Sequence, residues 1–535
     1  MPPPPPPSGH VEIEVKASLR QVAQGRDLVA ALPASSRGPE RVDRVRDVYL
    51  DTTGRDLLAA GYGFRIRTTN GDRFEATLKA IDERDARGLH VREERTVPLE
   101  APVRDPRLLP DGALRRLLAA ITDGRPLVPL ARVTGTRTRR RLRVDAELGA
   151  EASLDRVVVA AGGASAPLLE LEVERTKGDE AAFRGWIERA WRGRHVRLCA
   201  PSKFERALAL ARIRVPSAVR IAASRLSLEE VGPDTPSARA GARDFARLAA
   251  DLERAIASAR RGAVEGVHET RTLSRRLRAV LAFHAPDVPG PVYDDARTRL
   301  RALRRAAGPV RDLDVFVEAL LAAPLPAAEE RGRALLVVVV RARRAAARTA
   351  LARALASRKL DGFASRWARP VDELARATSV PFAWAAALRL PRTLEPVLAA
   401  RRAAGPLLAE ASAARIHELR IAAKRARYEF EACVPALGKP GRRFTKRLKA
   451  FVDAAGDLHD AETGAAAVRD LARGVPRLAG ERTAAERAAA LLGEVLDARA
   501  KEGREAIEAL YRAALGPAPV RELLGHLAKR VAEPR

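Results

Sequence analysis

The stretch Val11-Glu-Ile-Glu-Val-Lys16 alternates apolar and charged residues without interruption. Successive side chains of a β-strand point to opposite faces, so this stretch predicts a strand with one apolar and one charged face. The same alternation returns far along the chain in Leu169-Glu-Leu-Glu-Val-Glu174. Together these segments predict about eight antiparallel strands, near residues 10–18, 43–51, 62–69, 73–80, 90–98, 130–144, 152–161 and 167–175. Helical patterns near 20–31, 107–122 and 179–191 separate some of them.

The charged faces of these strands differ in sign. Glu12 and Glu14 share one face, and Arg65 and Arg67 share another. Any single pair of this kind also suits a solvent-facing strand, but the separation of acids from bases along several strands favours a binding site. If the apolar faces pack outward against helices, the charged faces point into a closed barrel. Acids there would hold divalent cations, and arginines and lysines would clamp phosphate groups.

The pattern becomes helical after residue 213, where Ala, Leu and Arg recur at a spacing of about 3.6 residues. Pro370 and Pro391 are expected to interrupt these helices. Segment 213–235, which is rich in Pro and Gly, is expected to be a linker between domains. The Pro-rich start, residues 1–9, is expected to be a disordered tail.

Two stretches of the helical half carry the same ladder of charge, with a histidine followed by cations at +3, +7 and +10. These positions fall on one face of a helix, where like charges cost about 0.2–0.5 kcal/mol per pair. A chain that repeats this cost is expected to bind an anion there. The residues are His268, Arg271, Arg275 and Arg278, then His417, Arg420, Lys424 and Arg427.

A second pair of matching blocks follows at nearly the same offset, Gly308–Asp314 with Gly456–Glu462. Matching blocks at a constant offset predict two tandem helical-bundle repeats, over about 236–385 and 386–535.

Composition narrows the class of partner. The chain has 535 residues, which indicates more than one domain, and a net charge of +29. That charge predicts a polyanionic partner such as nucleic acid, an acidic membrane surface or a phosphate polymer. Aromatic residues make up only 4%, which leaves few platforms for stacking of single-stranded bases. No apolar run approaches the ~20 residues that span a bilayer, and the two distant cysteines indicate neither a disulfide framework nor a zinc site.

The segment Glu12-Ile-Glu-Val-Lys16 resembles the ExExK motif of CYTH domains, the triphosphate tunnel metalloenzymes. Further similarities occur in order within residues 10–212: Tyr49-Leu-Asp-Thr52, Phe64-Arg-Ile-Arg67, Lys79, Arg92 with Glu94, the Arg137–Arg141 run, Asp155, Glu170-Leu-Glu-Val-Glu174 and Ser202-Lys203. The resemblance implies an eight-stranded tunnel that hydrolyses inorganic triphosphate, or a related triphosphate or short polyphosphate, with Mg²⁺ or Mn²⁺. The family includes thiamine triphosphatases and adenylyl cyclases, but no base-recognition or ribose-binding motif is present here.

The resemblance also implies roles for individual residues. It implies catalytic roles for Glu12, Glu14 and Lys16. The implied metal ligands are Glu12, Glu14, Glu170, Glu172 and Glu174. The implied phosphate ligands are Arg65, Arg67, Lys79, Arg139 and Lys203, where Arg139 is chosen from a run of arginines whose register is open.

The helices expected at 267–284 and 416–432 resemble the histidine-bearing helices of CHAD domains, conserved-histidine α-helical modules that bind inorganic polyphosphate. This resemblance covers roughly residues 236–535 and implies that the eight ladder residues bind polyphosphate. The expected fold is therefore α+β, with an N-terminal barrel and an all-α C-terminal domain.

Two other functions stay open, a non-catalytic polyphosphate-binding protein with a degenerate tunnel and, less favoured, a nucleic-acid-binding protein. We expect a cytoplasmic protein, free or associated with polyphosphate granules.

Overall fold

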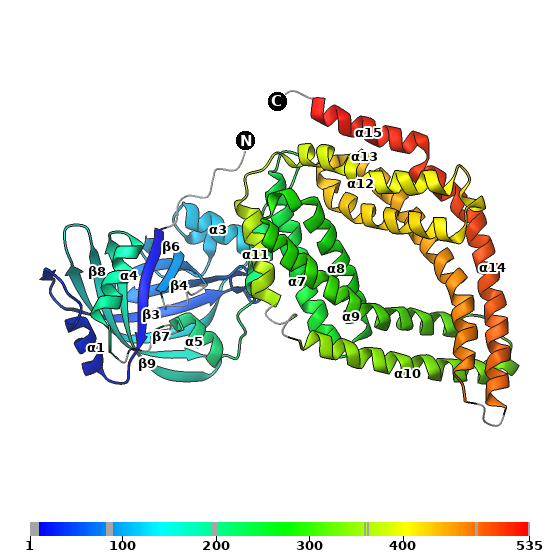
Figure 1. Ribbon diagram of the computed structural model, residues 1–535. Helices are drawn as coiled ribbons and strands as arrows, with labels where there is room; N and C mark the ends of the chain where they lie inside the picture. The colour runs from blue at the N-terminus through cyan, green and yellow to red at the C-terminus, as the bar shows by residue number, and fades with distance from the viewer. Residues whose placement is uncertain are drawn as a thin grey trace. The chain divides into compact units, whose positions relative to one another are not determined.

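The computed structural model describes residues 10–81, 89–194, 196, 198, 201–357, 360, 363–476 and 480–532. The tail expected at residues 1–9 lies outside this part of the chain. The chain divides into two compact units, Met1–Ser217 and Ala218–Arg535. In Figure 1 the first unit runs from blue to cyan-green and the second from green to red.

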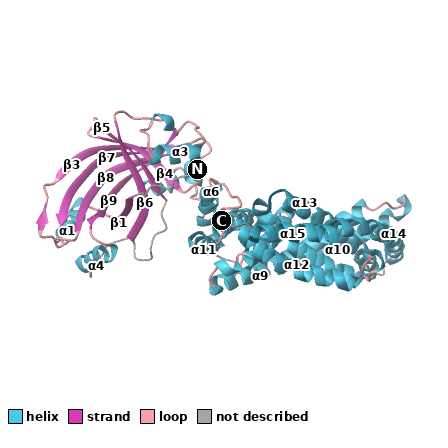
Figure 2. Cartoon of the chain, turned by 90° about the horizontal axis from the view of Figure 1, so that it is seen from above, coloured by secondary structure: helices cyan, strands magenta, loops and turns pink. Residues whose placement is uncertain are grey.

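The first unit is a closed antiparallel barrel, as the alternating segments predict. Its strands are β1 (His10–Ser18), β3 (Arg41–Asp51), β4 (Tyr62–Thr69), β5 (Arg73–Ala80), β6 (Leu89–Leu99), β7 (Val128–Arg143), β8 (Gly149–Ala161) and β9 (Ala164–Lys177). They pair in the order β7-β3-β4-β5-β6-β1-β9-β8, and a further pairing of β7 with β8 closes the wall. A two-residue strand, β2 (Ser36–Arg37), extends the pairing along β7. The expected eight-stranded barrel is therefore confirmed, and Figure 2 shows its strands in magenta.

Helices cover the apolar outer faces of the strands. They are α1 (Val22–Ala30), α2 (Asp56–Ala59), α3 (Ala113–Thr122) and α4 (Glu180–Ala190). Ile13 of β1 shares a buried cluster with Trp186 of α4, and Phe64 of β4 shares another with Leu118 of α3. Each such side chain contributes about 1.5–3 kcal/mol by leaving water. A register slip of one residue would turn the charged faces toward these helices, so this burial fixes which side chains point inward.

A further helix of the first unit, α5 (Lys203–Leu210), fills part of the barrel interior. Its start is fixed by a capping box in which Ser202 and Glu205 each accept a hydrogen bond from the other's backbone N–H. Phe204 packs so closely on β4 that a Cβ at Gly63 would lie 2.8 Å from its ring. The inward-pointing apolar side chains that pack with this helix include Val133, Val157 and Val159. The helix thereby leaves only the polar part of the interior open.

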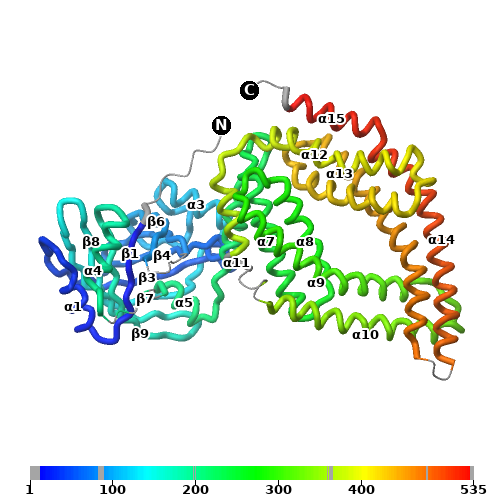
Figure 3. Tube along the Cα trace, viewed as in Figure 1, coloured from blue at the N-terminus to red at the C-terminus, as the bar shows by residue number. Residues whose placement is uncertain are grey.

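The second unit is helical, as expected. Its helices are α6 (Ala218–Ser227), α7 (Ser237–Arg260), α8 (Val264–Phe283), α9 (Gly290–Ala322), α10 (Glu330–Leu355), α11 (Phe363–Arg376), α12 (Phe382–Ala404), α13 (Ala413–Arg473), α14 (Glu481–Leu515) and α15 (Pro517–Ala532). Helix α13 starts 149 residues after α8, the offset between His268 and His417. It bends at Gly438, where φ is 62°, and Figure 3 traces this change of direction. None of the described helices is long and apolar enough to cross a membrane.

The helical unit departs from the sequence-based expectation at two kinds of position. Segment 213–235, expected to be a linker, contains α6, because Val219 and Leu226 are buried in the core of the helical unit. The interruptions expected at Pro370 and Pro391 are wrong, since α11 and α12 continue through both residues. A proline inside a helix loses one hydrogen bond and is tolerated where packing holds the helix on both sides. In α12 that packing comes from Leu390 and Leu394, which are fully buried.

Candidate functional site

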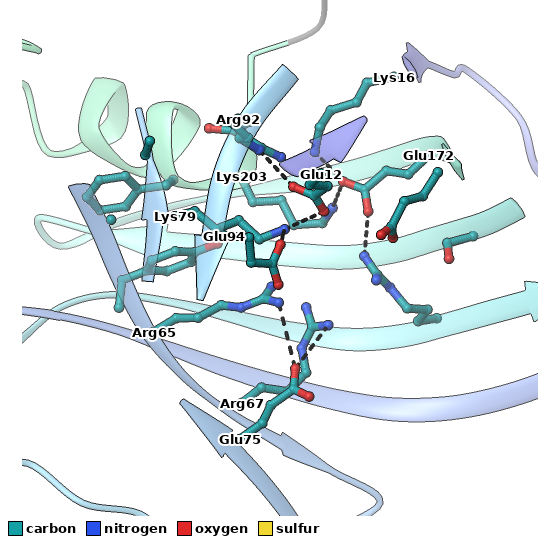
Figure 4. Close-up of a pocket in the computed structure, with 18 of the residues that line it drawn as sticks. Glu12, Lys16, Arg65, Arg67, Glu75, Lys79, Arg92, Glu94, Glu172 and Lys203 are labelled. Atoms are coloured by element: carbon teal, nitrogen blue, oxygen red, sulfur yellow. Dashed lines mark hydrogen bonds and ion pairs between the residues drawn. The ribbon is translucent and has the colours of Figure 1, made fainter. Parts of the chain in front are cut away.

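The open part of the barrel is a cavity of about 210 Å³ whose wall is mainly charged. The charged side chains lining it are Glu12, Lys16, Arg65, Arg67, Glu75, Lys79, Arg92, Glu94, Arg137, Arg139, Glu151, Glu172, Glu174 and Lys203. Figure 4 shows ten of the lining residues with labels, reaching into the cavity from several strands and from α5. We call this space the tunnel cavity.

Strand register decides which charges meet in the tunnel cavity. Between β1 and β9, Lys16 lies opposite Glu172 and Glu14 lies opposite Glu174. Between β1 and β6, Glu12 lies opposite Arg92. Opposite residues of an antiparallel pair have Cβ atoms about 4.5–5.5 Å apart, so each pair is within reach of a direct contact.

Three buried carboxylates surround the ammonium group of Lys203. Its Nζ lies 2.8 Å from an oxygen of each of Asp155, Glu170 and Glu172. The three carboxylates offer oxygens that all lie within 4.8 Å of one another. Burial raises the pKa of Glu170, whereas for Glu172 burial is outweighed by Lys16, Lys203 and Arg137, which hold its pKa well below the usual range. We call these three carboxylates the acid cluster.

A second group of acids lies on β1. Nε of Arg92 donates to Oε2 of Glu12 at 2.9 Å, and a terminal nitrogen of Arg92 also contacts Glu14. Lys79 lies 2.7 Å from Glu12 and 2.6 Å from Glu94. Burial acts to raise the pKa of Glu12, but Lys79 and Arg92 outweigh it and lower the pKa. Both acids of the ExExK segment therefore have cationic partners.

The wall formed by β3, β4 and β7 is rich in arginine. Arg67 donates two hydrogen bonds, of 2.7 and 2.8 Å, to the carboxylate of Asp47, and Arg65 donates one of 3.2 Å to the same carboxylate. Burial acts against ionisation of Asp47, but Arg67 and Arg65 outweigh it and lower its pKa. Arg137 contacts both Asp155 and Glu172 at 2.6 Å. Guanidinium groups held in this way stay charged and are positioned to face an anion.

Most residues that the sequence singles out in this half line the tunnel cavity. Glu14 and Glu170 do not line it, but they are buried directly behind it against Arg92 and Lys203. The five expected metal ligands do not form one group, because Glu12 and Glu14 pair with Arg92 whereas Glu170 and Glu172 join Asp155 around Lys203. For Glu174, burial followed by the charge of Glu12 raises the pKa to about 7.

The structure adds residues that the sequence-based assignment did not select. They are Asp47, Arg92, Glu94, Arg137 and Asp155. Alternation alone puts Arg137 and Arg139 on one face, but Arg137 is the deeper of the two, with 16% of its side chain exposed against 33%. Four of the five, all except Asp47, belong to segments that resemble CYTH motifs. The sequence therefore contained these residues within recognisable motifs, but no role was predicted for them.

The acid cluster fits a divalent cation. Carboxylate oxygens are the ligands that Mg²⁺ and Mn²⁺ prefer, and three of them converge here. Among the described residues, Oε2 of Glu170 is buried and has no hydrogen-bond partner. The ammonium of Lys203 holds the position of a cation between the three carboxylates.

The two cationic ladders form one charged region in the second unit, because α8 packs against α13. We call their eight residues the paired stripes: His268, Arg271, Arg275, Arg278, His417, Arg420, Lys424 and Arg427. Apart from Arg427, which is buried, these side chains are half-buried. Arg271 contacts Asp312, and Arg427 lies 3.1 Å from Asp453.

Positive charge is only partly neutralised along the paired stripes. Within the described part of the chain, Arg275, Arg278 and Lys424 have no ion-pair partner. Burial, followed by the charges of Arg275, Arg420, Arg427 and Arg271, lowers the pKa of Lys424 to about 8. Burial and Arg271 likewise lower the pKa of Arg275. The charges of the two helices therefore act on one another, and an anion bound between them would relieve the repulsion.

The comparisons with known proteins agree with this division. A family model for the CYTH domain matches residues 10–207, and one for the CHAD domain matches residues 243–469.

Similar solved structures include a putative adenylyl cyclase from Hippeastrum, described as having a dominant triphosphatase activity. It is 22% identical, and the match covers 38% of this chain and 98% of that one at a TM-score of 0.30. The CHAD domain from the plant Ricinus communis is 23% identical over 52% of this chain and 94% of its own, with a TM-score of 0.40. PptA from Streptomyces chartreusis is 20% identical over 52% of this chain and 100% of its own, with a TM-score of 0.39. The chain thus carries a CYTH domain at residues 10–207 followed by a CHAD domain at residues 243–469.

Proposed function

We propose that the CYTH domain hydrolyses inorganic triphosphate, or a related triphosphate or short polyphosphate, with Mg²⁺ or Mn²⁺. The observation that carries this proposal is the tunnel cavity, where Glu172 of the acid cluster, together with Glu12 and Glu174, faces a wall of fixed cations inside a closed barrel. Phosphoryl transfer depends almost entirely on positioning and on neutralising charge on the phosphate oxygens. Buried charged groups whose partners hold them in place support the proposal on both points.

The proposed roles follow from position in the tunnel cavity. Arg65, Arg67, Lys79, Arg137 and Arg139 bind the phosphate oxygens, together with Lys203 and Arg92 at the acid cluster and β1. Asp155, Glu170 and Glu172 would hold the divalent cation, with Glu12, Glu14 and Glu174 on the same side of the barrel. A cation held there would supply neutralisation of developing charge and activation of a water molecule. Lys16, which contacts Glu172 and lies 3.3 Å from Glu14, positions the two acid groups relative to each other.

Phosphate release tests this proposal directly. The substrates are inorganic triphosphate, ATP, thiamine triphosphate and long-chain polyphosphate, each with Mg²⁺, with Mn²⁺ and with chelator. Glu12→Ala and Glu14→Ala are expected to lower kcat by about 10²–10³-fold, the usual cost of removing one group that positions charge. Glu93→Ala is the matched control, because Glu93 lies on β6 next to Arg92 but pairs with Arg95 outside the cavity. Equal losses from Glu93→Ala and Glu12→Ala would contradict the assignment.

We further propose that the CHAD domain binds inorganic polyphosphate through the paired stripes. The support is the concentration of half-buried cations that lack neutralising partners, since a flexible polyanion can contact all of them at once. Binding of a phosphate polymer releases counterions, so affinity is expected to fall steeply as salt rises. This proposal does not depend on catalysis in the tunnel cavity.

A charge-matched pair of variants tests the second proposal. In the first, four stripe residues are replaced by Gln: Arg271, Arg275, Lys424 and Arg427. In the second, the replaced residues are exposed arginines off the stripes that pair with nearby acids: Arg247, Arg254, Arg297 and Arg473. Only the first variant should lose affinity for labelled polyphosphate and show a flatter salt dependence. Equal losses would mean that net charge alone binds the polymer, and equal competition by DNA at matched phosphate concentration would favour nucleic-acid binding.

A further inference from the structure

The outer face of β3, β7 and β8 carries arginine but no acid in its central part. Side chains along each strand alternate between the barrel interior and the outside. The acids of this part, Asp43, Asp47 and Asp155, are buried on the inner face, where each accepts hydrogen bonds from an arginine. The outward positions between them hold exposed arginines instead. We call these the outer arginines: Arg44 and Arg46 on β3, Arg132 on β7 and Arg156 on β8.

Strand pairing brings the outer arginines onto one surface. Thr136 of β7 lies opposite both Arg44 and Arg156, and Thr134 lies opposite Arg46. The three strands are neighbours in the sheet (Figure 2). Neighbouring strands are about 4.8 Å apart, and residues two apart on one strand are separated by about 7 Å. Each outer arginine therefore has another within about 10 Å, which is close to the Debye length, so the four charges act together.

This positive charge is not neutralised from within the barrel. None of the outer arginines has an ion-pair partner in the described part of the chain. On the inner face of β7, by contrast, Arg137 and Arg139 each contact a carboxylate. Single exposed arginines are ordinary surface residues, but neighbouring like charges on a sheet are destabilising. Four of them on one face without an acid therefore favour a surface that binds an anion.

We propose that the outer arginines bind a strand of inorganic polyphosphate on the outside of the CYTH barrel. Guanidinium groups bind phosphate oxygens through two parallel hydrogen bonds. The hydroxyl groups of Thr134 and Thr136, which stand between the arginines, can donate further hydrogen bonds. This inference goes beyond the proposed function, which assigns polyphosphate binding to the paired stripes. It also stands whether or not the tunnel cavity hydrolyses triphosphate.

The chemistry of the surface favours a phosphate polymer over two other polyanions. None of the outward-facing residues of these three strands, all of which are described, is aromatic, so nucleic-acid bases would find no stacking platform. The exposed apolar side chains, Val42 and Val158, lie on β3 and β8 with β7 between them. They form no continuous apolar surface that could enter a bilayer. A polymer with a charge on every phosphate needs neither feature and can contact several arginines at once.

Chemical protection of individual arginines tests the proposal in the full chain. Phenylglyoxal modifies accessible guanidinium groups, and mass spectrometry measures the rate at each arginine. Long-chain polyphosphate at about ten times the Kd of this surface is expected to slow modification of the outer arginines about tenfold, because only about a tenth of the surface is then free. Exposed arginines elsewhere on the first unit should keep their rates: Arg20, Arg26, Arg116 and Arg192.

Binding by a chain whose paired stripes are neutralised measures the outer surface by itself. The background carries Arg271→Gln, Arg275→Gln, Lys424→Gln and Arg427→Gln. Adding Arg44→Gln, Arg46→Gln, Arg132→Gln and Arg156→Gln is expected to remove the remaining affinity for labelled long-chain polyphosphate. The charge-matched control adds Arg20→Gln, Arg26→Gln, Arg116→Gln and Arg192→Gln instead and should retain that affinity. Circular dichroism checks that each variant is folded.

Three results would overturn the proposal. The first is a failure of long-chain polyphosphate to protect the outer arginines. The second is an equal loss of affinity in the outer-arginine variant and its control, which would mean that net charge alone binds the polymer. The third is stronger protection by RNA, or by vesicles containing phosphatidylserine, at matched phosphate concentration. Protection is measured residue by residue, so a failure at the outer arginines is distinguishable from a failure at the paired stripes.

Discussion

Replacing Lys203 with Ala is expected to destabilise the CYTH domain strongly and in a way that depends on pH and on divalent cations. Lys203 holds three carboxylates at 2.8 Å, and its own side chain is only 6% exposed. Asp155 and Glu172 keep Arg137 as a partner after the change. Within the described residues, Glu170 loses its ion-pair partner altogether.

The magnitude follows from breaking a buried ion pair, which costs about 3–5 kcal/mol. Glu170 can take up a proton instead of remaining a buried anion, and burial already raises its pKa. The expected loss is therefore at the lower end, about 3 kcal/mol at neutral pH. With a urea dependence of about 2 kcal/mol per molar, this moves the unfolding midpoint by about 1.5 M.

The pH dependence has a definite sign. In the wild type, burial acts to raise the pKa of Glu172, but Lys16 and Lys203 outweigh burial and hold this pKa well below its unfolded value. That stabilisation is present above the unfolded pKa and is lost as pH falls through the folded value. Without Lys203 the acids protonate at higher pH in the folded state. The gap between wild type and variant should therefore be widest near neutrality and shrink as pH falls toward about 4.

Tryptophan fluorescence can report on the barrel alone. Trp186 and Trp191 lie at α4, whereas Trp367 and Trp384 lie in the helical unit and can be replaced by Phe in every protein compared. Lys177→Ala is the control, because Lys177 is exposed on β9 and, among the described residues, donates only to the backbone oxygen of Ala146. Mg²⁺ should stabilise Lys203→Ala more than the wild type, since the ammonium no longer occupies the acid cluster. The reasoning is refuted if Lys203→Ala loses no more stability than Lys177→Ala.

Three further outcomes are expected. Polyphosphate affinity should fall as pH rises above about 8, because Lys424 has a pKa of about 8 and a bound polyanion raises that pKa. Binding above pH 8 therefore takes up a proton. Calorimetry at pH 7, 8 and 9 should show the fall in affinity, and Lys424→Arg should abolish it. Gly63→Val should lower the free energy of unfolding by about 1–3 kcal/mol, because its Cβ would lie within 3 Å of the Phe204 ring. An unchanged urea midpoint would contradict that packing. Ser202→Ala should lower the free energy of unfolding by about 1 kcal/mol, because it removes the cap of α5. It should also lower kcat, because Lys203 begins that helix. Unchanged phosphate release would show that the cap does not position Lys203.

The strand half was predictable in outline because alternation is a local signal. Each of the eight long strands coincides with an alternating segment, since one face is buried under helices and the other is charged. Helix α5 escaped prediction because it spans eight residues and its apolar face packs on strands far away in the sequence. Its position inside the barrel depends on closure of β7 on β8, which no local pattern encodes.

The candidate site was predictable by residue type but not by grouping. The alternation of side chains along a strand places Arg137 and Arg139 on the same face. Arg137 lies deeper in the barrel, and for that reason it contacts Asp155 and Glu172. The acids likewise separate into two groups because Lys16 lies opposite Glu172 while Glu12 lies opposite Arg92. Such cross-strand register is a property of the closed sheet, so it becomes visible only in the structure.

The helical half shows the complementary case. The ladder spacing placed six cations and two histidines on two helix faces, but contact between α8 and α13 is a tertiary feature. The approach of His459 to His417 depends on the bend at Gly438, because the two residues lie on different arms of α13.

The central claim is that the tunnel cavity performs metal-dependent hydrolysis of a triphosphate. Its most direct test is the rate of phosphate release from inorganic triphosphate by the full wild-type chain, measured with Mg²⁺ or Mn²⁺ and again after chelation. The account predicts turnover with at least one of these ions and loss of turnover when both are removed. Absence of release from any triphosphate with either ion, or release that is unchanged by chelation, would contradict it.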